Sequence, residues 1–145
     1  MTYNSDNLTI RLGAIRDRIR KAERRFGREE GTVALVAVSK TRPAGDILTC
    51  VEAGQRLFGE SYLQEATEKI SALSALNLQW HFIGPIQSNK TRPVAEHFHW
   101  VHSVDRLKIA RRLSEQRPKG LPPLNMCLQV NISGELKKSG ASLQD

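Results

Sequence analysis

The sequence predicts an α/β protein, a partial (β/α)8 TIM-type barrel of about five βα units with an extra N-terminal helix. Short apolar runs end near residues 40, 60, 84, 104 and 132, and amphipathic helical patterns separate them. This alternation, at intervals of roughly 20 to 28 residues, is typical of parallel strands joined by crossover helices. Neither G-x-G-x-x-G nor G-x-x-x-x-G-K-[ST] follows the first run, which favours a barrel over an open nucleotide-binding sheet.

The first element predicted is an amphipathic helix over residues 6–26, with apolar side chains in steps of three and four. Arginines occupy its other faces and contribute much of the formal net charge of +7, which suggests anionic partners. Acidic residues such as Asp17 and Glu23 are mixed in, so we interpret the helix as a cover with a solvated face. Binding of a membrane surface or of nucleic acid is the alternative.

The βα units follow Gly31 in a regular order. A helix near residues 44–54 ends at Gly54, a residue type typical of helix C-termini, and Asp105 is interpreted as the N-cap of a later helix. The predicted strands cover residues 35–40, 56–60, 78–84, 99–104 and 126–132, and the remaining helices cover residues 62–73, 88–97 and 105–116.

The first strand carries the main functional hypothesis, because its apolar run ends in Lys40. Parallel strands bring their last side chains to the carboxyl edge of the sheet, where α/β folds place their chemistry. A lysine with an apolar wall behind it loses hydration, so its pKa falls. The resulting neutral amine can form a Schiff base with an aldehyde. A strand-end lysine whose ammonium simply reaches solvent is the alternative.

Length and composition bound the organisation of the chain. Its 145 residues suit one barrel domain over residues 1–145. No apolar run approaches the roughly 20 residues that cross a bilayer, and nothing resembles a signal peptide. Cys50 and Cys127 favour a reducing compartment and core packing over a disulfide framework. We therefore expect a cytoplasmic protein without a membrane partner.

A complete barrel needs eight units and about 250 residues, so five units are expected to leave the domain incomplete at the C-terminus. The first and fifth strands would then remain as open edges, which favour aggregation. We expect weak folding, self-association through these edges, or rescue by a partner.

Several motifs resemble one family, in its order and spacing along essentially the whole chain. They are residues 38–40 (VSK), 58–60 (FGE), 80–90 (WHFIGPIQSNK), 131–133 (NIS) and 138–140 (KSG). On these residues the chain is similar to the pyridoxal phosphate homeostasis protein family.

The resemblance implies a barrel of the alanine racemase N-terminal type that holds pyridoxal 5'-phosphate as a Schiff base on Lys40. It implies a carrier without an established catalytic reaction, which buffers the cofactor or delivers it to enzymes that require it. The family usually has asparagine near the cofactor where this chain has Ser61, whose hydroxyl has a shorter reach. His81 lies within the longest motif, so it is a candidate contact at the barrel mouth, with a core histidine as the alternative. The family's phosphate-binding loops belong to later strands, beyond the five present here.

Three other functions are weighed against this one. A racemase or decarboxylase of the same barrel type would need an added β domain, which this sequence does not encode. A nucleic-acid-binding protein would rest on the charge of +7, but aromatic residues make up only 6% and there is no zinc knuckle, which disfavours it. His97, His99 and His102 lack a convincing cysteine or carboxylate partner, so no metal site is predicted.

Overall fold

Five strands form one parallel sheet in chain order in the computed structural model, which describes residues 5–142. The strands are β1 (Ala37–Val38), β2 (Leu57–Glu60), β3 (Gln79–Phe82), β4 (Trp100–Val104) and β5 (Asn125–Leu128). Each strand pairs with the next one in the sequence. The order contains no reversal, so the sheet is singly wound, as in a barrel, and lacks the switch point of a doubly wound fold.

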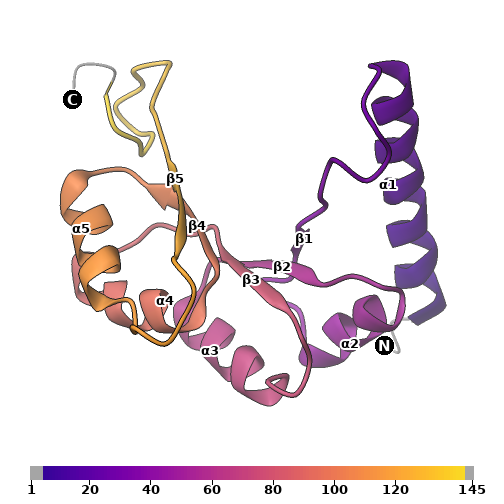
Figure 1. Ribbon diagram of the computed structural model, residues 1–145, viewed down its shortest axis with the longest axis horizontal. Coiled ribbons are helices and arrows are strands. Elements are labelled where there is room, and N and C mark those ends of the chain that lie inside the picture. Colours follow the sequence, from indigo (N-terminus) through magenta and orange to yellow (C-terminus); the bar gives the residue numbers. More distant parts are fainter. Residues whose placement is uncertain (1–4, 143–145) are drawn as a thin grey trace.

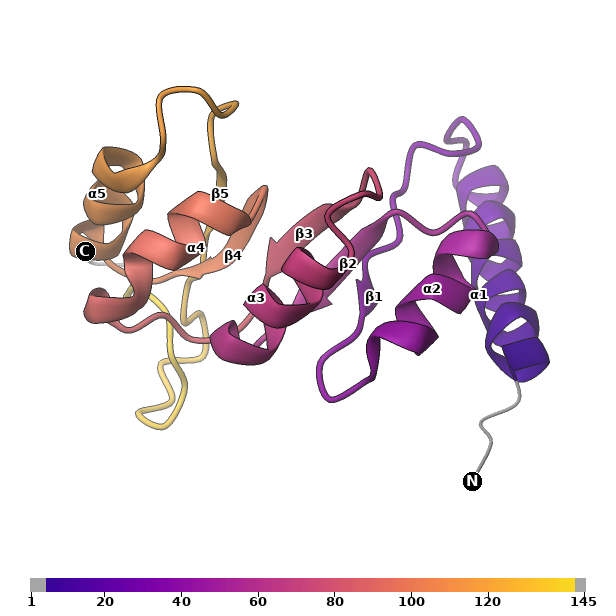
Figure 2. The same ribbon diagram turned by 90° about the horizontal axis from the view of Figure 1, so that it is seen from below.

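The connecting helices lie together on one side of this sheet (Figures 1 and 2). They are α2 (Ala44–Glu52), α3 (Leu63–Ala72), α4 (Thr91–His97), which follows the 3-10 turn η1 (Ser88–Lys90), and α5 (Leu107–Gln116). In Figure 1 the strands form an arc with these helices outside it, and the inner face of the arc is open. The prediction of a partial barrel with about five βα units is confirmed.

The hydrophobic core lies between the sheet and its helices. Alternate strand residues supply one wall, including Phe58 of β2, Trp80 and Phe82 of β3 and Val101 of β4, all buried. Ile109 and Leu113 of α5 are fully buried against this layer, together with residues of the other helices. Because strand side chains alternate between faces, the residues between these core positions point to the inner face of the arc.

The extra N-terminal helix is α1 (Ser5–Arg25), which packs beside α2. Leu12 is buried at this contact, and the Arg16 guanidinium donates hydrogen bonds to the Ala53 carbonyl at 2.5 Å and to Gln55 Oε1 at 2.9 Å. Phe26, the last residue of the helix predicted over residues 6–26, lies beyond the helix end and is 73% exposed. Glu23, interpreted from the sequence as part of a solvated face, is instead buried.

The buried carboxylate of Glu23 organises the loop that leads to β1. It accepts hydrogen bonds from the backbone N–H groups of Gly31 at 3.0 Å and Val33 at 2.7 Å. These bonds lower the pKa of Glu23, with the Val33 bond contributing most.

Several boundaries differ from the sequence prediction. The first strand covers only Ala37–Val38, whereas the sequence predicted residues 35–40. Among the described residues it pairs with β2 alone, as an edge strand. The fifth strand ends at Leu128, and most of its side chains are exposed.

The ends of two helices can also be compared with the prediction. The last helix, α5, begins at Leu107 with Arg106 as its N-cap, so the interpretation of Asp105 as the cap is wrong. The Asp105 carboxylate instead pairs with the Arg106 guanidinium at 2.7 Å. Gly54, at which a helix end was predicted, has a positive φ of 85° two residues after the end of α2.

Among the described helices, none combines the length and apolar character that crossing a membrane requires.

Candidate functional site

Lys40 lies two residues beyond the end of β1, at the carboxyl edge of the sheet. Sheet-like pairing continues as far as Ser39, whose N–H donates to the Gly59 carbonyl at 2.9 Å. Ala37 pairs with the core residue Phe58, so by alternation Val36, Val38 and Lys40 belong to the inner face of the arc.

The expected dry surroundings of Lys40 are not present in this structure. Lys40 is exposed, and Val38 before it is 54% exposed, because β1 is an edge strand and its inner face is uncovered. The amine is therefore accessible to solvent and to a ligand, and no apolar wall encloses it. The proposal that burial activates this lysine is thus not supported by its environment here.

The residue after Lys40 has an unusual backbone conformation. Thr41 has φ of 61°, in the left-handed region that β-branched residues seldom adopt. The Thr41 N–H donates a hydrogen bond at 2.7 Å to Oε1 of Glu65, which lies in the first turn of α3. Backbone strain of this kind persists only when neighbouring contacts enforce it, and it often marks a functional segment.

The residue before Lys40 belongs to a buried polar network. The Ser39 hydroxyl donates to Glu60 Oε1 at 2.7 Å, and Lys69 of α3 donates to the same oxygen at 2.8 Å. Lys69 Nζ also donates to the Ser39 carbonyl at 2.8 Å and to Glu65 Oε1 at 2.5 Å. One ammonium thus joins the ends of β1 and β2 to α3.

The charges of this network are unequal, since two carboxylates face one ammonium. The hydrogen bond from Lys69, followed by that from the Thr41 N–H, lowers the pKa of Glu65 against the opposing effect of burial. Glu60 is fully buried, and its Oε2 is the one buried side-chain oxygen or nitrogen without a hydrogen-bond partner among the described residues. Such an atom is costly to bury and is rare in folded proteins.

Sequence reasoning singled out Glu60 only as part of a motif, and it missed Glu65 and Lys69. A signal was available, because Lys69 falls within the apolar stripe of its helix, beside the buried Ala66. A lysine at such a position needs a buried anionic partner, and the strand that precedes the helix ends in a glutamate.

Ser61 follows β2 as Lys40 follows β1, and the Ile83 N–H bond to the Glu60 carbonyl, at 2.9 Å, brings the chain after β3 beside it. Gly84 packs directly against the backbone of Ser61: a Cβ built on Gly84 would lie 2.4 Å from the Ser61 carbonyl oxygen. The structure thus places Lys40 and Ser61 at equivalent positions on neighbouring strands.

His81 lies on the inner face, in the same cross-strand row as Val38 and Gly59 and therefore below the level of Lys40. Its ring stacks on Trp100 with a centroid distance of 5.8 Å, and its Nδ1 lies 2.9 Å from His102 Nε2. Burial, followed by repulsion from His102 and His99, lowers its pKa to about 4. His81 is therefore neutral at pH 7 and belongs to the floor of the inner face.

The other histidines that the sequence singled out lie in different surroundings. His99 Nδ1 accepts the Trp80 N–H at 3.0 Å, His102 contacts His81, and His97 ends α4. In the part of the chain that is described, no three histidine, cysteine or acidic side chains gather as metal ligands would. Lys138, which belongs to the last of the family motifs, pairs with Glu135 at 2.6 Å in the loop after β5.

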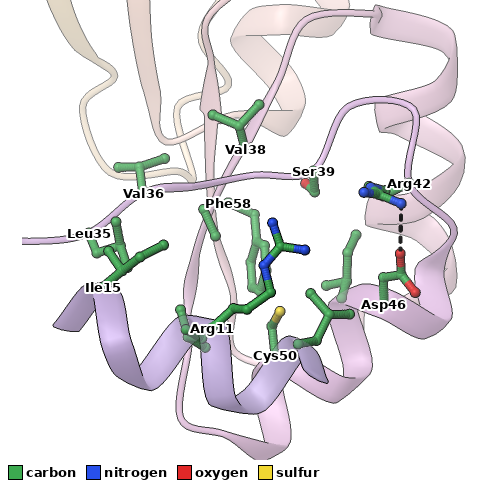
Figure 3. A pocket seen from close by; sticks show the side chains of 14 residues that line it. Arg11, Ile15, Leu35, Val36, Val38, Ser39, Arg42, Asp46, Cys50 and Phe58 are labelled. Atoms are coloured by element: carbon green, nitrogen blue, oxygen red, sulfur yellow. Dashed lines mark ion pairs between the residues drawn. The ribbon is translucent and has the colours of Figure 1, made fainter. Parts of the chain in front are cut away.

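A cavity of about 340 Å³ opens between α1 and the edge strand β1 (Figure 3). Its lining is mainly apolar, and its polar side chains include Arg11, Ser39 and the Arg42–Asp46 ion pair, whose atoms are 3.9 Å apart. Lys40 does not line this cavity, so the cavity and the lysine are distinct features of the β1 edge.

The sheet is a singly wound parallel arc, and a lysine lies just past its first strand. These two features define the class of protein as a barrel domain, in which active sites lie at the carboxyl edge of the strands. The family model for the alanine racemase N-terminal domain matches residues 10–145, and the chain belongs to this family.

Two curated relatives carry the name pyridoxal phosphate homeostasis protein. The chain is 63% identical to the Pseudomonas aeruginosa protein over 134 residues, which cover 92% of this chain and 58% of that protein. It is 51% identical to the Escherichia coli protein over 143 residues, which cover 97% of this chain and 61% of that protein. The chain therefore spans about three fifths of the length of these relatives.

Solved structures show the same fold. PipY of Synechococcus elongatus, solved with PLP bound, is 38% identical with a TM-score of 0.76, and the match covers 92% of this chain and 57% of PipY. An unknown protein from Bifidobacterium adolescentis is 34% identical with a TM-score of 0.84, over 94% of this chain and 60% of that protein.

Proposed function

We propose that this chain holds pyridoxal 5'-phosphate as a Schiff base on Lys40 and acts in homeostasis of this cofactor. The observation that carries the proposal is the position of Lys40: an exposed amine at the carboxyl edge, between two residues whose backbones are hydrogen-bonded to one network. The names of the two curated relatives and the PLP-bound PipY structure support the choice of cofactor.

The residues present suit an aldehyde cofactor. In its neutral form the Lys40 amine attacks the aldehyde carbon, the C=N bond forms and one water molecule leaves. On the inner face below it lies the half-buried Trp100 indole, which stacks on the buried, neutral His81 ring. Ser61 would lie beside the lysine and contribute one hydroxyl. When bound, the cofactor supplies a reactive aldehyde, and the protein's role is to hold it reversibly.

The proposal extends to partners and location. Recipients of the cofactor would be apoenzymes that require it, and the protein would act in the cytoplasm. The edges at β1 and β5 expose Val38 and Leu128, so self-association through them is part of the proposal. It does not include binding of nucleic acid.

The test is to mix the purified chain with pyridoxal 5'-phosphate, follow the yellow imine band, reduce with borohydride and map the modified residue. We expect modification at Lys40, loss of the band in Lys40→Arg, and an unchanged band in Lys138→Arg, a control that alters an exposed lysine elsewhere. Equal labelling of many exposed lysines, or a band that persists in Lys40→Arg, would contradict the proposal. Added alanine or ornithine then tests for turnover, which a carrier should not show.

A further inference from the structure

Glu65 connects the turn that carries Lys40 to the buried ammonium of Lys69. One oxygen, Oε1, accepts both the Thr41 N–H at 2.7 Å and Lys69 Nζ at 2.5 Å. Lys69 in turn donates to the Ser39 carbonyl at 2.8 Å. The backbone is therefore held on both sides of Lys40, while the Lys40 side chain remains exposed.

The bond from Glu65 also accounts for the conformation of Thr41. A left-handed φ of 61° is unfavourable for a β-branched residue and needs a compensating contact. The Thr41 N–H meets a carboxylate whose pKa is lowered by Lys69, so the acceptor is charged at neutral pH and the bond is charge-assisted. Loss of this acceptor would allow the turn to relax toward ordinary backbone angles.

We infer that Glu65 is a positioning residue for Lys40, which sets the direction in which the amine leaves the sheet edge. The inference rests on the proposed function, because it takes the Lys40 amine as the reacting group. Glu65 acts through the backbone of Thr41, whereas Lys69 and Glu60 hold Glu65 and the strand ends in place.

Three variants of α3 separate this role from a purely structural one. Glu65→Ala removes the acceptor, Glu65→Gln keeps an amide oxygen that accepts the Thr41 N–H without the charge, and Glu68→Ala removes an exposed carboxylate nearby on the same helix. The Glu65 side chain is 31% exposed, so its loss should leave the chain folded. Far-UV circular dichroism and thermal unfolding of each variant check this.

The first measurement needs no cofactor. In Glu65→Ala we expect amide hydrogen exchange at Thr41 to rise roughly tenfold or more, as for loss of a charge-assisted hydrogen bond. In Glu65→Gln the exchange rate at Thr41 should lie between those of Glu65→Ala and of the unmodified chain. Glu68→Ala should leave the exchange rate at Thr41 unchanged. An unchanged exchange rate in a folded Glu65→Ala would overturn the inference, whatever the chain does with pyridoxal 5'-phosphate.

The second measurement uses pyridoxal 5'-phosphate as the probe. Glu65→Ala should still be labelled at Lys40 but form the imine several-fold more slowly, with a weaker induced circular dichroism of the bound chromophore, and Glu65→Gln should recover part of both. Imine formation and dichroism equal to those of the unmodified chain would overturn the positioning role. If the unmodified chain itself is not labelled at Lys40, the proposed function fails, and with it the role of Glu65 toward a reacting amine.

Discussion

Lys69 Nζ lies 2.8 Å from Glu60 Oε1, and this ion pair is buried: the side chain of Lys69 is 8% exposed and that of Glu60 is 0% exposed. The pair lies on the helix side of the sheet, whereas Lys40 belongs to the inner face. Because Lys69 also holds the Ser39 carbonyl and Glu65, the pair links the packing of α3 to the geometry of the Lys40 turn.

Removal of the ammonium should destabilise the fold strongly. Lys69→Met leaves Glu60 as an uncompensated buried charge, so we expect a loss of about 3–5 kcal/mol in the free energy of unfolding, measured in urea. Lys108→Met, at an exposed position of α5, is the control and should change it by less than about 0.5 kcal/mol.

The double variant Glu60→Gln/Lys69→Met tests the cause of that loss. It removes the buried charge and keeps an amide oxygen for the Ser39 hydroxyl, so part of the lost stability should return. A double variant as unstable as the sum of its single changes would mean that packing, not charge, holds this part of the chain together.

Acidification should weaken the fold through His81. Its pKa is about 4 in the folded chain, below the ordinary value of 6.5, because of burial and then of His102 and His99. The unfolded state therefore binds a proton on His81 more tightly than the folded state does. The stability that neutral His81 contributes is complete above pH 6.5 and is lost as the pH falls toward 4. The loss amounts to as much as about 3 kcal/mol.

The measurement is the free energy of unfolding between pH 7 and pH 4. His81→Asn should flatten the slope over this window, whereas His97→Asn, at the exposed end of α4, should keep it. A slope that is the same in His81→Asn and in the unmodified chain would assign the acid sensitivity to other groups.

The sequence was sufficient for the architecture, because the alternation of apolar runs and amphipathic helices depends on local burial patterns. It also placed Lys40 at the carboxyl edge of the sheet, although the strand itself ends two residues earlier, at Val38. It could not show that Lys40 is exposed, since this depends on which segments cover the inner face. Nor could it show that Glu65 reaches Thr41, a contact between residues 24 positions apart that depends on how α3 packs against the sheet.

Gly84 should be intolerant of a side chain. In Gly84→Ala the new Cβ would lie 2.4 Å from the Ser61 carbonyl oxygen and 2.8 Å from its Cα, so the segments after β2 and β3 must separate. We expect a loss of about 1–3 kcal/mol in urea unfolding.

Gly13→Ala is the matched control, because nothing lies within 4 Å of a Cβ at this position in α1. It should stabilise the chain by about 0.5–1 kcal/mol, since alanine is the better helix former. Equal effects of the two substitutions would contradict the close packing of Gly84 on Ser61.

Thr41 allows the stability of the turn to be separated from its role in holding Lys40. Thr41→Gly relieves the left-handed strain, which is about 1–2 kcal/mol, against a glycine entropy cost of about 0.5–1 kcal/mol. The free energy of unfolding should therefore stay equal or rise by up to about 1.5 kcal/mol. Thr41→Pro fixes φ near −65° and removes the N–H that Glu65 accepts, so it should lower stability by more than about 1 kcal/mol.

The same two variants should differ in their reaction with pyridoxal 5'-phosphate, followed as the rate of imine formation. Thr41→Gly keeps the N–H and its bond to Glu65, so Lys40 should react at nearly the rate of the unmodified chain. Thr41→Pro should react more slowly, because the backbone after Lys40 leaves its left-handed conformation and the amine changes direction. A Thr41→Pro variant that is folded and reacts at the unmodified rate would show that the turn does not orient the lysine.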